Sequence, residues 1–439
     1  MAIVAFAFRA GFLAVFPGPN YYDGISRSYL EVANNVLLGK GIVTYVNVAP
    51  IASPTPEWRY EPFIDRPLGY LFLILLPLVI TPNPIGVQIL HALLASLSTI
   101  LLYKVGGKIS SEAAAWRAAL LYALWPLSAR FEVTILPDAV MSFFLLLSIF
   151  FLLKALSSAH STHWFFLAGI TCGIGMSMRP DILPFPLFVA AWLFFSQHFS
   201  KWVQASLTIL LGVVIIVGAQ TARNAAVTDG KLVPLGLGNG ISLWEGISQF
   251  GDTLGTVHDD QKLAAQEGYW GWAYPNGVER ERKRFREAID LIISHPLWYS
   301  GVMLKRLPVL LTPDGIMTRT IAPSLKEFLD ALPQRSIGGY VSAYPAAVLV
   351  RGSLVVLHYF TLLLAAWVLW KRRRERLLDL PALVIFYYIV VHIPTNTEAR
   401  YFYPAVPFLI LLASIGWDVL KETKRRAHTY ARQHHHSGL

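Results

Sequence analysis

Long apolar runs recur along most of this chain and restrict its fold more than any other feature. Each run approaches the roughly 20 residues that an α-helix needs to cross a bilayer. With 55% hydrophobic and only 15% charged residues, the sequence is too apolar for a water-soluble globule of 439 residues. It therefore predicts an all-α integral membrane protein. The clear spans are 85–104, 112–131, 138–156, 163–178, 181–197, 202–222, 346–370, 380–394 and 403–420.

Three further apolar segments decide how many spans the bundle has. We expect residues 1–16 to form a first helix and not a cleaved signal peptide, because they lack a basic leader and a small-residue cleavage site. That helix brings the bundle to about ten spans. Segments 67–81 and 296–311 are short and bounded by prolines, so we expect both to be interfacial helices. If both cross the membrane instead, the bundle has about twelve spans.

Basic residues in the connections between spans set the topology. Cytoplasmic loops carry an excess of Lys and Arg, and here the clusters alternate correctly if all of them lie inside. They are Lys104, Lys108 and Arg117, then Lys154, Lys201, Lys371 to Arg374, and Lys421 with Lys424 to Arg426. The net charge of +10 then reflects membrane topology, and we expect no nucleic-acid partner. The outer ends of the spans present Asp23, Asp138, Arg179, Arg223 and Arg400.

The chain divides into four predicted parts. Residues 1–222 form a transmembrane module that includes a first outer loop (17–66) and an interfacial helix (67–81). Residues 223–344 form a small extracytoplasmic cap that contains the second interfacial helix, and 345–420 add the C-terminal transmembrane helices. Residues 421–439 form a basic cytoplasmic tail.

Two details of composition narrow the possible sites. Within the cap, residues 279–292 alternate acids and bases, as a solvated helix does. Cys172 is the only cysteine, which excludes an intramolecular disulfide and a cysteine-rich metal site.

The first outer loop combines an acidic residue with an amphipathic helix. From Tyr29 onward apolar residues recur at helical spacing, and Gly39 and Gly41 end the helix. Tyr22 and Asp23 stand at its leading end, where a carboxylate could meet a substrate. The alternative is that Asp23 only caps the helix, since Asp is a favoured capping residue.

Seven segments, taken in order, carry a family pattern. They read YLEVANNVLLGKG (29–41), DRPLGYLFL (65–73), ILPDAVMSFFLLL (135–147), GITCGIGMSMRPDILPFPL (169–187), GNGISLWEG (238–246), ISHPLWYSGVMLKRL (293–307) and NTEARYFYPAVPFLILLA (396–413). The ordered set resembles the bacterial branch of the GT-C polytopic glycosyltransferases, the relatives of protein O-mannosyltransferase and of the lipid A aminoarabinose transferase. The resemblance covers nearly the whole chain. It implies a GT-C-type bundle, a polyprenyl-phosphate sugar donor, and a site on the extracytoplasmic face of a bacterial cytoplasmic membrane.

Sugar transfer from a lipid phosphate to a hydroxyl needs a base for the acceptor proton. Asp23 is the predicted base, because a positioned carboxylate can take that proton. Asp138 is the predicted second carboxylate, which orients the acceptor or shares a divalent metal with Asp23. No cofactor is required by this chemistry, and that metal is the one cofactor left open. The alternative for Asp138 is a helix cap after Pro137.

The same reaction needs cations for the phosphate that leaves. Arg66 and Arg400 are the predicted ligands of the donor phosphate, with Tyr401 beside Arg400, because guanidinium binds phosphate through paired hydrogen bonds. Snorkelling toward lipid headgroups is the alternative role of both arginines. Five more residues are weaker substrate-binding candidates, although a tryptophan near a bilayer often only anchors the interface. They are Tyr22, Asp65, Arg179, Asn239 and Trp244.

We therefore expect an inverting glycosyltransferase that acts on a hydroxyl of a lipid, glycan or protein and works among membrane lipids. A lipid-linked-oligosaccharide transporter or flippase is one alternative, and a polysaccharide ligase or polymerase is another. A transporter would favour charges near mid-membrane and two corresponding halves. Here the charges gather at one surface and no halves correspond, so the enzyme is the preferred interpretation.

Overall fold

The computed structural model describes residues 1–15, 23–158, 161–195, 202–250, 254–313, 325–330, 336–372 and 378–436. In this part of the chain, five helical stretches are long and apolar enough to cross a membrane. They are α4 (Ile85–Ile109), α7 (Asp138–Leu156), α10 (Trp202–Ala226), α18 (Pro345–Lys371) and Ala399–Arg425. The last stretch joins the short 3-10 helix η3 (Ala399–Ala405) to the start of α20 (Val406–His436). The chain is thus a multi-pass membrane protein.

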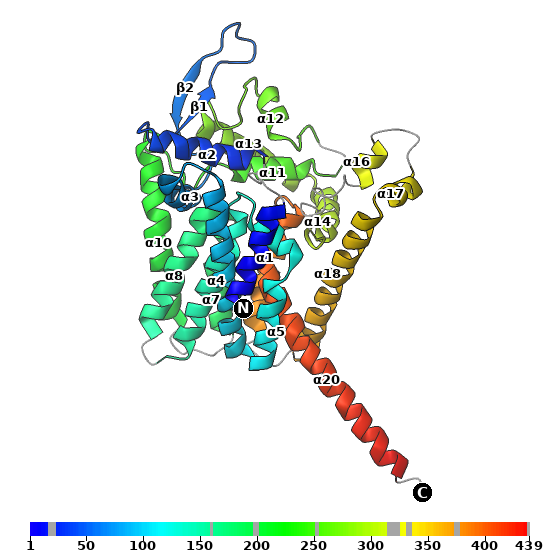
Figure 1. The fold of residues 1–439 in the computed structure, drawn as a ribbon. Helices are drawn as coiled ribbons and strands as arrows, with labels where there is room; N and C mark the ends of the chain where they lie inside the picture. The colour runs from blue at the N-terminus through cyan, green and yellow to red at the C-terminus, as the bar shows by residue number, and fades with distance from the viewer. Residues whose placement is uncertain are drawn as a thin grey trace.

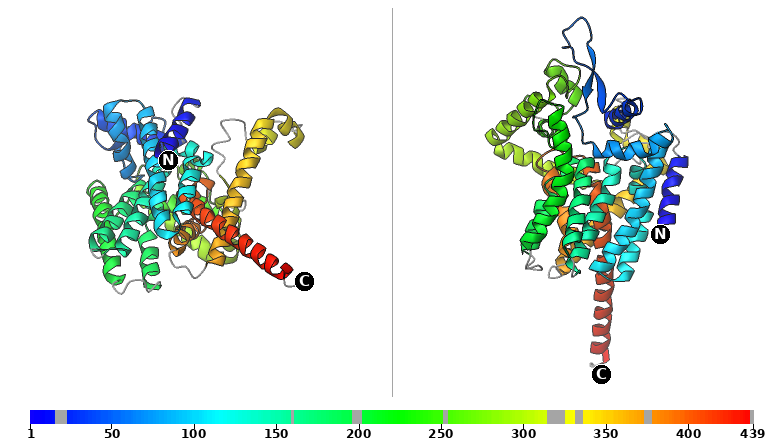
Figure 2. Two further views of the ribbon diagram at one scale, coloured as in Figure 1. Left: turned by 60° about the horizontal axis from the view of Figure 1, so that its bottom comes forward. Right: turned by 90° about the vertical axis from the view of Figure 1, so that its left-hand side faces the viewer.

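Shorter helices complete the bundle (Figures 1 and 2). The predicted span 112–131 is interrupted, because Pro126 has no backbone N–H and begins a new helix after the extended Trp125. The shorter helices are α1 (Ala2–Val15), α5 (Glu112–Ala123), α6 (Pro126–Glu132), α8 (Ser161–Met178), the 3-10 helix η1 (Pro180–Ile182), α9 (Phe185–Phe195) and α19 (Asp379–His392).

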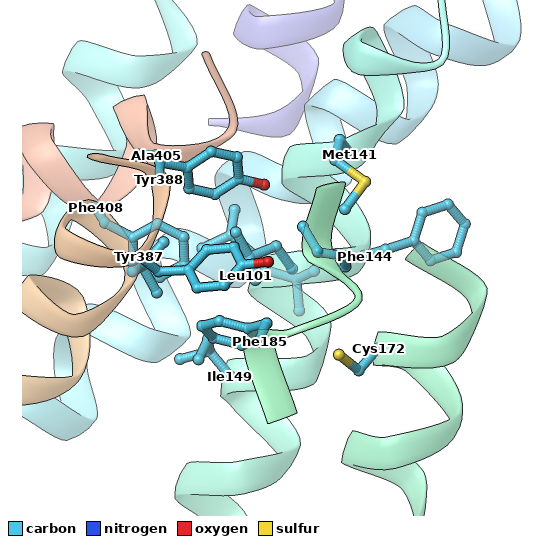
Figure 3. Close-up of a cluster of buried hydrophobic side chains, with 14 of the residues drawn as sticks. Leu101, Met141, Phe144, Ile149, Cys172, Phe185, Tyr387, Tyr388, Ala405 and Phe408 are labelled. Atoms are coloured by element: carbon cyan, nitrogen blue, oxygen red, sulfur yellow. The ribbon is translucent and has the colours of Figure 1, made fainter. Parts of the chain in front are cut away.

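Apolar side chains from several helices interdigitate inside the bundle (Figure 3). Phe185 of α9 meets Tyr387 of α19 edge to face, with their ring centroids 5.1 Å apart. Helices α8 and α10 approach closely at Gly169 of α8 and Gly212 of α10. A Cβ added to Gly169 would lie 2.1 Å from the carbonyl oxygen of Ile209. Small residues permit this close approach of membrane helices.

Two helices lie across the end of the bundle that is drawn uppermost in Figure 1, namely α2 (Asp23–Leu37) and α3 (Gly69–Ile80). Gly39 and Gly41 follow α2 with φ of +74° and +90°, which confirms the predicted end of this helix. Helix α3 buries Tyr70 and Ile74 while Leu76 is 62% exposed. Its orientation is that of an interfacial helix, and its depth in a bilayer stays a prediction.

A cap covers this upper end, and it includes elements of the first outer loop as well as of the predicted cap region 223–344. It contains a two-stranded antiparallel sheet, β1 (Val43–Asn47) and β2 (Trp58–Pro62), in which Tyr45 pairs with Tyr60. The other elements above the bundle and beside it are α11 (Asn239–Ile247), α12 (Asp260–Gln266), α13 (Gly277–Ser294), α14 (Pro296–Leu310), α16 (Leu325–Asp330) and α17 (Ile337–Ala343). Helix α20 projects from the opposite end (Figure 1).

The prediction of a solvated helix at 279–292 is wrong for two of its charged residues. Glu281 and Arg284 of α13 are buried, at 9% and 2% exposure. Arg284 pairs with Glu267, with Nε 2.6 Å from Oε1. Glu281 accepts hydrogen bonds from the backbone N–H groups of Gly238 (2.7 Å) and Gly240 (2.6 Å) and so fixes the start of α11.

Candidate active site

A cavity of about 430 Å³ lies where the cap meets the upper end of the bundle. Its wall comes from α2, the loop before α3, the start of α7, the α8–η1 junction, α11, α19 and η3. It brings together seven of the ten predicted site residues. These are Asp65, Arg66, Asp138, Arg179, Asn239, Arg400 and Tyr401.

Asp138 is the first residue of α7 and is only 2% exposed. Its carboxylate forms an ion pair with Arg179, and its Oδ2 lies 4.0 Å from Nη1 of Arg400. An acid in the first turn also suits the positive end of the helix dipole. The N-cap position belongs to Pro137, where no side-chain capping hydrogen bond forms, so the contacts of the Asp138 carboxylate are those with the arginines.

Arg400 reaches the cavity from η3. Its Nε and Nη2 donate to the two carboxylate oxygens of Glu398 at 2.7 and 3.0 Å. The Tyr401 hydroxyl donates to the same carboxylate at 3.1 Å. The ring of Tyr401 lies 5.1 Å from Cζ of Arg400 and 4.7 Å from Cζ of Arg179, within the range of cation–π attraction. The ring of Tyr401 thus contacts two guanidinium groups.

Glu398 was not predicted from the sequence, although it stands two residues before Arg400 in the run NTEAR. An acidic residue two positions before an arginine can indicate an ion pair, because a short turn lets the acidic side chain fold back onto the guanidinium group. The extended backbone of Glu398, just before η3, permits this contact.

Arg179 also belongs to a second group of polar residues. Pro180 ends α8 and leaves Arg179 extended, which turns its side chain out of the helix. Its Nε lies 3.2 Å from Oδ2 of Asp181, and Nε2 of His392 lies 3.2 Å from the same oxygen. The sequence analysis missed Asp181 and His392. Their only signals were the run RPD and a histidine at the end of an apolar helix.

Asp65 and Arg66 enter the cavity from the loop before α3. Asp65 Oδ1 and Arg66 Nε are buried, and neither atom has a hydrogen-bond partner among the described residues. Burial raises the pKa of Asp65 to about 6, and the neighbouring Arg66 opposes this rise. The loop is held by Leu237, whose N–H donates to Ile64 at 2.9 Å, and Gly236 packs on the backbone of Arg66.

Asn239 lines the cavity at the start of α11, where Glu281 fixes the backbone on both sides of it. Trp244 belongs to the same helix but does not line this cavity. It packs instead among apolar residues of α11, α13 and α14, beside Leu243 and Ile247. The structure therefore does not bring Trp244 to the other candidates.

Two predicted residues cannot be placed with the others. Tyr22 lies outside the described residues, and Asp23 begins α2 but its side chain is not among those described. Ile25 of the same turn does line the cavity. Among the side chains that are described, no three of His, Cys, Asp and Glu gather closely enough to hold a metal ion. A metal shared by Asp23 and Asp138 stays a prediction.

An apolar groove of about 560 Å³ runs between α9 and α10. Its walls include Leu187, Val214 and Gly218. Leu187 and Val214 are more than half exposed, at 62% and 60%, on the outer surface of the bundle. Leu183 lines both this groove and the charged cavity. The two spaces are therefore neighbours that share one side chain.

Part of the chain matches a known protein family, and the whole structure is similar to solved structures. Residues 65–221 match the family described as dolichyl-phosphate-mannose-protein mannosyltransferase, and no curated protein sequence matches the chain. The structure is similar to the oligosaccharyltransferase of Archaeoglobus fulgidus in the apo form, at TM-score 0.53 and 11% identity. That alignment covers 98% of this chain and 51% of the other, so the chain spans about half the length of that relative.

A second similar structure is ArnT from Cupriavidus metallidurans bound to undecaprenyl phosphate, at TM-score 0.41 and 13% identity. That alignment covers 94% of this chain and 76% of ArnT. The family match and the oligosaccharyltransferase likeness together confirm the predicted resemblance. The chain has the fold of the GT-C membrane glycosyltransferases.

Proposed function

We propose that the protein is a membrane glycosyltransferase that moves a sugar from a polyprenyl-phosphate donor to a hydroxyl acceptor. The acceptor is a lipid, a glycan or a protein, and the reaction takes place on the extracytoplasmic face of a bacterial cytoplasmic membrane. The cavity at the capped end of the bundle is the proposed site.

One observation carries the proposal: Leu183 belongs both to the apolar groove and to the charged cavity. A ligand that fills both spaces needs a long apolar part and a charged head. The groove between α9 and α10 offers burial for isoprene units, at about 0.8 kcal/mol per CH₂ group. Beyond Leu183, Arg66 and Arg400 line the charged cavity and offer guanidinium groups to an anionic head.

The charges that line the cavity favour phosphate over a neutral head. Three arginines and three aspartates face it, namely Arg66, Arg179, Arg400, Asp65, Asp138 and Asp181. Arg400 already contacts carboxylates, so a phosphate that binds Arg400 exchanges with one of them. The contact between Arg400 and Asp138 is the longest of the ion pairs, at 4.0 Å, so it is the one that a phosphate replaces most readily.

The residues then take these roles. Arg400 and Arg66 bind the donor phosphate, with Tyr401 holding Arg400 in place, and Asn239 contacts the sugar. Asp138 keeps Arg179 and Arg400 at the cavity wall. The acceptor oxygen attacks the anomeric carbon from the face opposite the phosphate, the bond from that carbon to the phosphate oxygen breaks, and Asp23 takes the acceptor proton. The products are the inverted glycoside and polyprenyl phosphate.

The test is incubation of the purified full-length protein in nanodiscs with undecaprenyl-phosphate sugars and a mixture of membrane lipids, glycans and peptides. Release of undecaprenyl phosphate, measured by mass spectrometry, supports the proposal. A flippase would move the intact donor across sealed vesicles without cleaving it. Translocation without release would therefore reject the transferase and favour the transporter.

A further inference from the structure

Glu132, the last residue of α6, is a fully buried carboxylate outside the cavity, with an exposure of 1%. Its Oε2 accepts from Nε of Arg9 at 2.6 Å. Its Oε1 accepts two phenolic hydroxyls, from Tyr122 at 2.6 Å and from Tyr403. Glu132 therefore joins α1, α5 and η3, which are far apart in the sequence.

A buried carboxylate is strongly unfavourable unless charge and hydrogen bonds compensate it. Arg9 supplies the charge, and it also donates to the carbonyl oxygen of Ala123 at 2.9 Å. These contacts tie α1 to α5 and need no help from η3. The hydroxyl of Tyr403 brings in a segment that also carries Arg400.

Glu132 and Tyr403 form one of two links between the same pair of segments. Glu132 precedes Asp138 by six residues, and Tyr403 follows Arg400 by three. Residues three apart lie on the same side of a 3-10 helix. Tyr403 also packs against Phe131, with ring centroids 4.4 Å apart and the rings tilted by 48°. The second link is the 4.0 Å contact from Asp138 to Arg400.

The two links differ in what a ligand can do to them. Asp138 and Arg400 line the cavity, so a bound phosphate competes with Asp138 for the guanidinium. Glu132 and Tyr403 do not line it, so their hydrogen bond is outside the space that a phosphate would occupy. When the contact between Asp138 and Arg400 opens, the hydrogen bond from Tyr403 to Glu132 still fixes η3 against α6.

We propose that Glu132 is a positioning residue for the donor site, acting through Tyr403 to hold η3 while Arg400 exchanges Asp138 for phosphate. This inference rests on the proposed function, because it needs Arg400 to bind the donor phosphate. Without Glu132, η3 would shift when its contact with Asp138 opens, and part of the phosphate-binding energy would be lost.

The two tyrosines provide a matched test. Tyr122→Phe and Tyr403→Phe each remove one buried hydroxyl from the same carboxylate oxygen, so a merely structural network predicts similar changes in both variants. Binding of undecaprenyl phosphate to the purified protein and thermal stability are measured for each. We expect the two variants to lose similar amounts of thermal stability. Only Tyr403→Phe should bind undecaprenyl phosphate more weakly, by about tenfold, as for loss of a hydrogen bond to a charged group.

A second variant shows whether the effect passes through Arg400. In an Arg400→Ala background, Tyr403→Phe should change binding no further. Equal affinity for undecaprenyl phosphate in the two tyrosine variants would overturn the inference. So would a Tyr403→Phe substitution that weakens binding as much in the Arg400→Ala protein as in the wild type. Either result would leave the proposed function standing. A wild-type protein that does not bind undecaprenyl phosphate would instead reject the donor site and this inference together.

Discussion

Oδ2 of Asp138 and Nη1 of Arg400 lie 4.0 Å apart, although one residue begins α7 and the other lies in η3, just before α20. This distance is beyond hydrogen-bonding range, whereas the same carboxylate pairs directly with Arg179. Arg400 can therefore exchange Asp138 for another anion while its Nε and Nη2 keep their short contacts with Glu398.

Arg400→Ala should therefore weaken the binding of undecaprenyl phosphate. The expected loss is about 2–5 kcal/mol, as for removal of one member of a desolvated charge pair. Arg400→Lys should restore only part of it, because the ammonium cannot form paired hydrogen bonds. Arg372→Ala at the opposite end of the bundle is the control. Wild-type affinity in a folded Arg400→Ala protein would remove Arg400 from the donor site.

The role of Asp23 can be separated from helix capping by two substitutions. If Asp23 is the base, Asp23→Asn keeps the cap and the donor affinity but lowers turnover by at least about 10²-fold. If Asp23 only caps α2, Asn retains activity, and Asp23→Ala lowers stability by about 1 kcal/mol. Turnover and thermal unfolding of both variants decide between these outcomes. An active Asp23→Asn enzyme would leave the proton to another group.

Asp65 should make stability depend on pH in an unusual direction. Its pKa of about 6 lies above its ordinary value of 3.8, so between these values the folded protein holds a proton that the unfolded chain has lost. The free energy of unfolding should then fall as pH rises from about 4 to 6, by at most about 3 kcal/mol from this group. Asp65→Asn should remove that part of the slope in thermal unfolding. Identical pH slopes in both proteins would contradict the assignment.

Filling the groove should discriminate between long and short lipid phosphates. A Cβ on Gly218 meets only Val214, at 3.9 Å, so Gly218→Leu places its side chain in the groove. We expect roughly tenfold weaker binding of undecaprenyl phosphate, as isoprene contacts worth about 1–2 kcal/mol are lost, and unchanged binding of a ten-carbon isoprenyl phosphate. Gly352→Leu, on a lipid-facing part of α18 with open space, is the control. Equal losses for both lipids would place the tail elsewhere.

The orientation of the bundle can be tested with single cysteines at exposed positions. The cap carries Thr55 and Lys283, and α20 carries Lys424 beyond the other end of the bundle. In intact cells an impermeant thiol reagent should label Thr55→Cys and Lys283→Cys but not Lys424→Cys, because basic tails stay inside. The buried Cys172 gives little background. The reverse pattern would place the site on the cytoplasmic face.

Much of the site could be predicted from local patterns. Arg66, Asp138 and Arg179 each stand next to a proline at a helix boundary or just before a helix, and Asp65 directly precedes Arg66. Such positions face outward whatever the helices pack against, because charged groups avoid the bilayer interior. The structure gathers all four around one cavity.

The sequence by itself determined the membrane class, the positions of most helices and the side on which the polar residues gather. These follow from helix length and from the cost of burying charge, which act within each segment. Only the tertiary structure decided which polar groups meet, as in the contacts of Glu132 with Tyr403 and of Asp181 with His392. Each pair joins segments far apart in the chain, so no spacing in the sequence encodes it. Each contact forms because packing removes both partners from water, and the partner then replaces the lost interactions with water.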